Sequence, residues 1–557
     1  MLLSGADILV KTLIEQGCDT VFGYPGGQIL NVYDSLYKYR NEINHVLTAH
    51  EQGAAHAADG YARTTGKVGV VISTSGPGAT NLVTGIATAY LDSIPMVAIC
   101  GNVPTTQIGT DSFQEVDITG ITLPITKHNY FVNSVEDLAD TIREAFRLAK
   151  SGRPGPVLID VPKDVQIAEC EYKKQAPVEK EKPFAAKDTR IEEAAEIINS
   201  AKRPFIYFGG GVIASDAQAE VLKLAEKLDA PMGCSLMGIS AIPTDHPRFL
   251  GMQGMHGHYA SSMSMHNADV IISLGVRFND RVTGNREKFA TGAKIVHIDT
   301  DGSELNKTVN SVCGLRGDIK LTLQKLLPLL NENKKAEWMA RVDAFRKEEE
   351  TYLDNREGLT PRKAILTLNK HLGKNTAVCT DVGQHQMWAA QSLDFKTSRR
   401  FASSGGLGTM GYGFGAAIGA AYGTGERSVL ITGDGSFGMN LNEMATAVRY
   451  NIPVVVIIMN NGVLGMVRQW QTLFYDKHYS NSVLERKTDF PALARAFGAN
   501  GEAVTTPEEL DESLSRAFKT EGPYIIDCKI DKDEFVLPML PPGGSMDDII
   551  TKIEVEL

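Results

Sequence analysis

Residues 429–461 read VLITGDGSFGMNLNEMATAVRYNIPVVVIIMNN and decide the fold of this chain. One apolar, β-branched run precedes the triplet Gly433-Asp434-Gly435, and a second precedes Asn460-Asn461. Apolar side chains between the two runs recur at helical spacing, so the stretch predicts one parallel strand–helix–strand crossover unit. Because the two strand ends of such a unit lie side by side, we expect Asp434 to meet Asn461 in space.

These two side chains give the first indication of chemistry. A carboxylate and an amide oxygen beside a helix N-terminus suit a hard cation that carries a diphosphate group. Each half alone has a plainer interpretation, with GDG as a turn and Asn460-Asn461 as an Asx-turn at a strand end. Both halves on one crossover frame favour a diphosphate-cofactor enzyme.

The composition is that of a globular protein with several domains. The 557 residues are 43% hydrophobic and 22% charged, and about 150 residues per domain predicts three or four domains. A net charge of −11 and a pI near 5.6 argue against a nucleic-acid partner. We expect no secretory signal and no membrane span, because the N-terminus has no basic and apolar leader pattern and the apolar runs are short.

The cysteines indicate a reducing compartment. Seven are scattered along the chain, an odd number, and none forms a CxxC motif. Reduced and mostly buried thiols are the expected state of such a set. We therefore expect a cytoplasmic protein.

Strand and helix patterns alternate over most of the chain, which predicts an α/β fold with three doubly wound parallel-sheet domains. Lys/Glu-rich segments separate these domains, and a Pro- and Gly-rich tail follows the last one. The expected boundaries are 1–168 for the first domain, 169–188 for a linker, 189–328 for the second domain, 329–358 for a helical connector, 359–530 for the third domain and 531–557 for the tail.

Glu51 is the second candidate site residue, at the junction of a predicted strand and helix in the first domain. A lone Glu at this position would stabilise the helix N-terminus. Two Gly-rich turns, at 24–27 and 74–81, end other strands of the same predicted sheet. Such turns at the carboxyl ends of one sheet form a ligand-binding edge, which favours a functional role for Glu51.

The GDG and Asn-Asn pair at this separation resembles the signature of thiamine-diphosphate enzymes. The resemblance implies a Mg²⁺ site built from Asp434, Asn461 and the Val463 carbonyl. It implies that Glu51 exchanges a proton with the aminopyrimidine ring of a cofactor held by another subunit. It also implies that Met410, in the Gly-rich stretch 405–413, wedges beneath the bent cofactor, although so many glycines alone indicate only a tight loop. The cofactor-binding residues so implied are Glu51, Gln384, His385, Gly408, Met410, Gly433, Asp434, Gly435, Ser436, Asn461, Val463, Leu464, Gly465 and Met466.

Three further motifs resemble the acetohydroxyacid synthase (acetolactate synthase) large-subunit family: SFQE at 112–115, RFNDRVTG at 277–284 and GMVRQWQ at 465–471. The resemblance implies decarboxylation of pyruvate and condensation with a second pyruvate or 2-ketobutyrate, the first common step of branched-chain amino-acid biosynthesis. It assigns the acceptor pocket to Trp470 and Arg281. Trp470 alone would suggest core packing, while its segment, rich in Arg, Gln and Gly, argues for a loop or surface position. The catalytic residues so implied are Glu51, Gly27, Phe113, Gln114, Lys127, Arg281, Met410 and Trp470.

Four rival functions remain. Pyruvate oxidase, 2-ketoacid decarboxylase and glyoxylate carboligase share the cofactor, but relatives of the last lack the acid at Glu51 and the decarboxylases carry a His-His pair where this chain has Phe113-Gln114. A non-catalytic flavin-binding protein would leave Glu51 and the GDG motif without a task.

The second domain carries Phe208-Gly209-Gly210-Gly211-Val212 without full GxGxxG spacing, which is a weak nucleotide signal. The resemblance nevertheless implies FAD there, in a structural role because the net reaction transfers no electrons. The positions implied for FAD are Arg153, Gly209, Gly210, Gly211, His256, Gly275, Arg277, Asp299 and Asp318. Expected partners are 2-ketoacids, further copies of the chain in a homodimer or homotetramer with active sites between subunits, and a regulatory small subunit.

Overall fold

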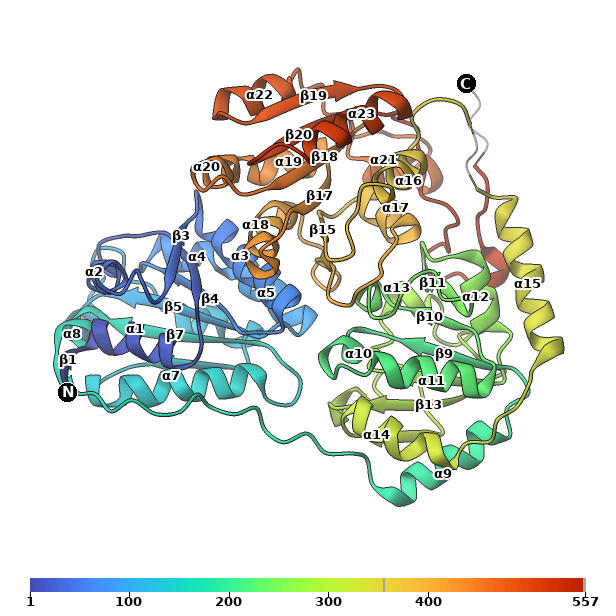
Figure 1. The fold of residues 1–557 in the computed structure, drawn as a ribbon, viewed down its shortest axis with the longest axis horizontal. Coiled ribbons are helices and arrows are strands. Elements are labelled where there is room, and N and C mark those ends of the chain that lie inside the picture. The colour runs from blue at the N-terminus through green and yellow to red at the C-terminus, as the bar shows by residue number, and fades with distance from the viewer. Residues whose placement is uncertain (354–355, 554–557) are drawn as a thin grey trace.

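Three six-stranded sheets organise the computed structural model, which describes residues 1–353 and 356–553 (Figure 1). Every strand pair within these sheets is parallel, which confirms the predicted α/β fold class. Near-continuous apolar strands such as β17 and β18 are buried along almost their whole length, as expected for parallel sheets covered on both faces.

The first sheet has the order β3-β2-β4-β5-β7-β6. Its strands are β2 Thr20–Gly23, β3 Asn44–Leu47, β4 Gly69–Ser73, β5 Met96–Asn102, β6 His128–Phe131 and β7 Pro156–Pro162. Its helices are α1 Gly5–Glu15, α2 Leu30–Lys38, α3 Glu51–Thr65, α4 Pro77–Asn81, α5 Val83–Asp92, α6 Ile118–Thr122, α7 Val135–Lys150 and α8 Lys163–Ile167.

The middle sheet has the order β11-β10-β9-β12-β13-β14. Its strands are β9 Pro204–Phe208, β10 Met232–Cys234, β11 Phe249–Met252, β12 Val270–Leu274, β13 Lys294–Asp299 and β14 Cys313–Arg316. Its helices are α9 Asp188–Asn199, α10 Gly210–Ala214, α11 Gln218–Leu228, α12 Tyr259–His266, α13 Asp280–Thr283 and α14 Ile319–Leu326, and α15 Ala336–Glu350 follows.

The third sheet has the order β16-β15-β17-β18-β20-β19, which repeats the topology of the first in chain order. Its strands are β15 Ala377–Thr380, β16 Phe401–Ser403, β17 Ser428–Gly433, β18 Val454–Asn460, β19 Asn500–Val504 and β20 Tyr524–Lys529. Its helices are α16 Pro361–Asn369, α17 Gln384–Ser392, α18 Tyr412–Thr424, α19 Asp434–Asn440, α20 Met444–Arg449, α21 Gly465–Phe474, α22 Phe490–Phe497 and α23 Pro507–Ala517.

Several segments differ from the sequence-based expectations. The predicted linker contains β8, Glu169–Glu171, because this segment pairs antiparallel with β1, Leu2–Ser4. The GDG triplet instead agrees with the expectations, because Gly433 ends β17 and Asp434 begins α19, as predicted for a strand end beside a helix N-terminus. The tail contains a short 3-10 helix, Met546–Asp548. Residues 354–355 of the connector and 554–557 of the tail lie outside the described residues, and the domain boundaries stay predictions.

Two expectations concerned the redox state of the cysteines and the presence of membrane-spanning segments. All seven cysteines are free, and all except the half-buried Cys170 are buried. Among the described residues, none of the helices is both long and apolar enough to span a bilayer.

Helices α3 and α18 join the first and third sheets, side by side at the centre of the molecule (Figure 1). Their backbones touch through small residues. A Cβ added at Gly419 would lie 1.8 Å from the Ala57 carbonyl oxygen, and one added at Gly60 would lie 2.1 Å from the Ala416 carbonyl oxygen. This interface therefore leaves no room for a methyl group at either glycine.

We expect Gly419→Ala to destabilise the protein by about 1–3 kcal/mol, the usual cost of overpacking a well-packed interface. The matched control is Gly292→Ala, where an added Cβ meets nothing within 4 Å, and its effect should stay within about 0.5 kcal/mol. Thermal unfolding midpoints measure both. Equal midpoints for the two variants would contradict a close α3–α18 contact.

Candidate functional site

Asp434 and Asn461 follow adjacent parallel strands, β17 and β18, whose register pairs Gly433 with Met459. Burial raises the pKa of the Asp434 carboxyl to about 6, while the backbone N–H groups of Asp434 and Gly435 oppose that rise. The Asn461 amide donates to Gln384 Oε1 at 3.3 Å, and its own oxygen accepts from the Val463 N–H at 3.2 Å. The structure thus brings both predicted strand-end side chains to one edge of the sheet.

This edge fits a magnesium diphosphate. A buried carboxylate, an amide oxygen and a backbone carbonyl are hard oxygen donors of the kind that Mg²⁺ prefers. His385, at the N-terminal end of α17, has a buried Nε2 without a hydrogen-bond partner among the described residues. A Cβ added at Gly433 would lie 3.0 Å from His385 Nδ1. An unpaired buried nitrogen beside the GDG motif is consistent with a polar ligand there.

A second group gathers at the carboxyl edge of the first sheet. Glu51 opens α3, is 9% exposed and accepts a hydrogen bond from Asn81 Nδ2 at 3.0 Å. The Gln28 N–H donates to Thr74 Oγ1 at 3.2 Å, which ties the turn containing Gly27 to the turn after β4. A Cβ added at Gly76 would lie 3.0 Å from the Gln114 Cα. Both Gly-rich turns, Glu51 and Gln114 therefore share this edge.

Phe113 and Lys127 are placed differently from the rest of that group. Phe113 is 84% exposed. Lys127 Nζ donates to the Leu148 and Ser151 carbonyls at 2.5 and 2.7 Å, at the end of α7. Burial lowers the pKa of Lys127 to about 8. The structure therefore ties the Lys127 ammonium to a helix C-terminus, and its predicted catalytic role stays a prediction.

A cavity of about 1400 Å³ lies between the three sheets and collects most of the remaining site residues. Residues of α3, α5, α10, α13, α21 and the Gly-rich loop before α18 form its wall. Among the residues predicted from the sequence, the lining includes Arg153, Gly210, Gly211, His256, Gly275, Arg277, Arg281, Asp299, Asp318, Gly408, Met410 and Met466, with Trp470. Glu51 and Gln114 are not among the described lining residues.

Arg281 and Trp470 meet inside this cavity. The Arg281 guanidinium lies 5.9 Å from the centre of the Trp470 ring, and that ring packs edge-on against Phe474 at 5.6 Å. Trp470 lies in a helix, so the loop alternative was wrong, and its side chain is half-buried, between the core and surface alternatives. Met466, Trp470 and Phe474 are four residues apart, which places them on one face of a helix. This spacing could have predicted the helix from the sequence.

The middle sheet offers a second ligand position. In chain order its strands follow the 3-2-1-4-5-6 arrangement of dinucleotide-binding folds, whose ligands bind where the order reverses. Here that point lies between β9 and β12, which Gly209 and Gly275 follow directly. Arg277 lines the cavity there, and burial lowers its pKa, with Arg153 adding to the effect. A half-buried guanidinium at this point fits the diphosphate of a dinucleotide such as FAD.

Sequence reasoning missed a group of buried charges at the wall of the cavity. Arg63 bridges Asp59 and Asp92, and these three side chains are at most 5% exposed. The Arg63–Asp59 pair has the i, i+4 spacing of a helical ion pair inside an alanine-rich helix, which was the available signal. Asp92, the other partner of Arg63, is distant in sequence, so no sequence pattern could have indicated its pairing with Arg63.

Comparisons with known proteins agree with this geometry. Models of thiamine pyrophosphate enzyme domains match residues 3–121 (N-terminal TPP binding domain), 191–326 (central domain) and 381–528 (C-terminal TPP binding domain).

Curated relatives match over almost the whole chain. The acetolactate synthase isozyme 3 large subunit of Escherichia coli is 42% identical over 98% of this chain and 98% of its own length. The isozyme 2 large subunit of the same organism is 42% identical over 99% and 100%, and the acetolactate synthase large subunit of Corynebacterium glutamicum is 44% identical over 98% and 90%. The chain therefore belongs to the acetolactate synthase large-subunit family of thiamine pyrophosphate enzymes.

Proposed function

We propose that this chain decarboxylates pyruvate on thiamine diphosphate and joins the resulting two-carbon unit to a second pyruvate or to 2-ketobutyrate. The observation that carries the proposal is the shared cavity of Met410, Arg281 and Trp470. A cofactor-bending residue and an acceptor pocket in one cavity suit a carboligase, whereas decarboxylation alone needs no second binding site. Family membership supports the same reaction over that of an oxidase or decarboxylase.

Each cofactor has a proposed set of holding residues. Asp434, Asn461 and the Val463 carbonyl hold Mg²⁺, and the Gln384–His385 end of α17 contacts the diphosphate. When bound, thiamine diphosphate would supply a nucleophilic carbon and an electron sink for the decarboxylation. FAD occupies the switch point of the middle sheet and has a structural role. The remaining implied cofactor residues, Gly435, Ser436, Leu464, Gly465 and Met466, surround the diphosphate edge.

Glu51 holds the proton that the aminopyrimidine must gain and lose. Asn81 Nδ2 donates to Glu51 Oε2, which fixes the orientation of the carboxyl group. A general acid–base group positioned in this way contributes about 10²–10⁴-fold to a rate. Arg281 binds the carboxylate of the acceptor through charge-assisted hydrogen bonds, and Trp470 offers an apolar face to its alkyl group.

The active site is proposed to need two copies of the chain. Glu51 and Gln114 lie at the first sheet, outside the described lining of the large cavity that contains Met410. A site between subunits places the Glu51 edge of one copy against the cavity of another, in a homodimer or homotetramer. Because the relatives are named large subunits, we also propose a smaller regulatory partner. The free, mostly buried cysteines support a cytoplasmic location.

Product analysis tests the function together with the proton role of Glu51. The purified chain with pyruvate, thiamine diphosphate and Mg²⁺ should form 2-acetolactate and CO₂, and acetaldehyde or acetyl phosphate as the main product would contradict the proposal. Glu51→Gln should lower the rate by about 10²-fold or more, because the amide keeps the size but cannot exchange the proton. The exposed Glu42, which pairs with Lys11, gives the control Glu42→Gln, whose rate should be unchanged.

Asp434→Ala should abolish Mg²⁺-dependent binding of thiamine diphosphate, because it removes the carboxylate ligand. The unfolding midpoint should not fall, since burial already disfavours the charged form of Asp434. Titration calorimetry measures the binding, with Asp188→Ala, at a side chain 74% exposed, as the control. Unchanged cofactor affinity in Asp434→Ala would remove Asp434 from the metal site.

Trp470→Leu should keep acetolactate formation but lose most of the preference for 2-ketobutyrate in a two-substrate competition. An extra methylene in an apolar pocket is worth about 10–200-fold in discrimination. Arg281→Ala should lower both products, because both acceptors carry the carboxylate. The control is Phe474→Leu, one turn further along α21. If it alters the product ratio as much as Trp470→Leu does, the effect is local packing and not acceptor contact.

A further inference from the structure

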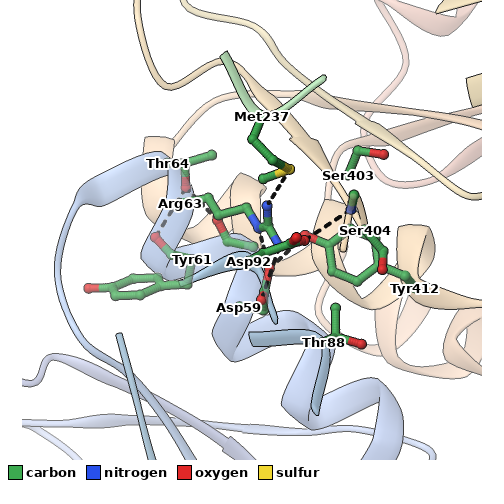
Figure 2. A network of polar contacts seen from close by, with 12 residues as sticks. Asp59, Tyr61, Arg63, Thr64, Thr88, Asp92, Met237, Ser403, Ser404 and Tyr412 are labelled. Atoms are coloured by element: carbon green, nitrogen blue, oxygen red, sulfur yellow. Dashed lines mark hydrogen bonds and ion pairs between the residues drawn. The ribbon is translucent and has the colours of Figure 1, made fainter. Parts of the chain in front are cut away.

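A buried charge cluster connects all three domains beside the cavity (Figure 2). Arg63 Nε lies 2.5 Å from Asp59 Oδ1, and its Nη2 lies 2.9 Å from Asp92 Oδ2. Tyr412, the first residue of α18, donates its hydroxyl to Asp59 Oδ1 at 2.6 Å. The sulfur of Met237, from the middle domain, accepts from Arg63 Nη1 at 4.0 Å. One arginine thus links side chains from the first, second and third domains.

Asp92 also holds the backbone of the Gly-rich loop. Its Oδ2 accepts from the Gly405 N–H at 3.0 Å, and its Oδ1 accepts from the Gly406 N–H at 2.7 Å. The same loop contains Met410 and ends at Tyr412. Because both oxygens are used, the carboxylate fixes two successive peptide groups and not one.

The far half of the loop has hydrogen bonds of its own, because the Thr409 N–H donates to Ser404 Oγ at 3.0 Å and Asn440 Nδ2 donates to the Gly411 carbonyl at 2.9 Å. The half that Asp92 binds is less well defined by other contacts. Gly408 and Gly411 have φ values of 71° and 86°, in the left-handed region that favours glycine. Leu407 is 42% exposed, so side-chain packing does not anchor the middle of the loop. Glycine-rich backbone without packed side chains is mobile unless hydrogen bonds hold it. The Thr409 hydroxyl also lies 2.8 Å from the Thr88 hydroxyl, again beyond the two peptides that Asp92 binds.

The placement of Asp92 is unfavourable for the helix that carries it. Asp92 is the last residue of α5, and a negative charge at a helix C-terminus opposes the helix dipole. A buried carboxylate also needs a charged partner or several donors. Arg63 and the two loop amides meet this need. The carboxylate is therefore best explained by what it holds, since its own helix gains nothing from it.

We propose that Asp92 is a positioning residue that sets the place of Met410 in the cavity by holding the Gly405 and Gly406 amides, with Arg63 keeping its carboxylate oriented. The Met410 part of this proposal rests on the proposed function. Arg63, Asp92, Gly405, Gly406 and Met410 all line the same cavity, so a small shift of the loop changes its shape directly. Misplacement by about 1 Å far from the reacting atoms can cost 10²-fold in rate.

Amide hydrogen exchange of the apoprotein, read on the peptide covering residues 401–413, tests the positioning. Asp92→Asn keeps the size but presents an NH₂ group to a donor, so exchange at Gly405 and Gly406 should become about 10-fold faster or more. The matched control is Glu15→Gln, which weakens another buried pair, with Arg143 at 2.8 Å, away from the cavity. It should lower the unfolding midpoint without altering exchange in this peptide.

Turnover separates the positioning role from plain stability. Asp92→Asn should lower kcat by about 10-fold or more with a smaller change in the KM for pyruvate, because Met410 acts on the cofactor and not on free substrate. If Asp92→Asn does not fold, Arg63→Lys replaces it in both measurements. Lysine keeps the positive charge but lacks the forked guanidinium that binds both carboxylates. Exchange in 401–413 equal to that of the unaltered protein, in whichever variant folds, would overturn the proposal. Failure of the proposed function would instead appear in the unaltered protein, as absence of 2-acetolactate.

Discussion

The close contact of α3 with α18 is the constraint on which the rest of the site depends. It joins the domain that contains Glu51 to the domain that contains the GDG motif, and backbone atoms rather than long side chains set the distance between them. Glu443, from the segment just before α20, extends the contact. Its carboxylate accepts from the Ala49 and His50 N–H groups at 3.2 and 3.1 Å, directly before Glu51. The start of α3, where Glu51 lies, is thus aligned by the third domain of its own chain.

Buried carboxylates recur along this contact, and each is matched by donors. Burial raises the pKa of Glu443 to about 7, against hydrogen bonds from Thr446 and the two backbone amides. Burial likewise raises the pKa of Asp381 to about 6, while the Gly413 N–H and the Thr432 hydroxyl bind its oxygens. Asp381 therefore holds the first turn of α18, directly after the loop whose start Asp92 holds. Met410 lies between two anchored peptide segments.

The sequence was informative where the determinants are local. The strand–helix–strand reading of 429–461 needed only neighbouring residues, and so did the expectation that Asp434 and Asn461 share an edge. The helical position of Trp470 was also local, but the polar residues around it concealed the period. The order of strands in the middle sheet is not local, because it depends on which strands pair across long crossovers.

Pairings between distant segments could not be predicted from one chain. No sequence pattern indicates that Arg63 pairs with Asp92, because buried ion pairs between distant residues follow from tertiary packing. The predicted polar linker also differs from expectation, because two of its residues, Lys180 and Phe184, lie in the wall of the cavity. Lys127 differs from these: the family resemblance implied a catalytic role for it, and its ammonium is bound by the carbonyls at the end of α7.

The contact of α3 with α18 also has a consequence for biosynthesis. Asp59 and its partner Tyr412 are 353 positions apart, so the first domain leaves the ribosome long before α18 exists. At ~5–20 residues per second, this interval lasts about 20–70 s. During that time the face of α3 that packs on α18, including Ala57 and Gly60, which are buried in the finished protein, is open to solvent. The nascent first domain therefore exposes an apolar helix face that becomes buried only after the last domain has been synthesised.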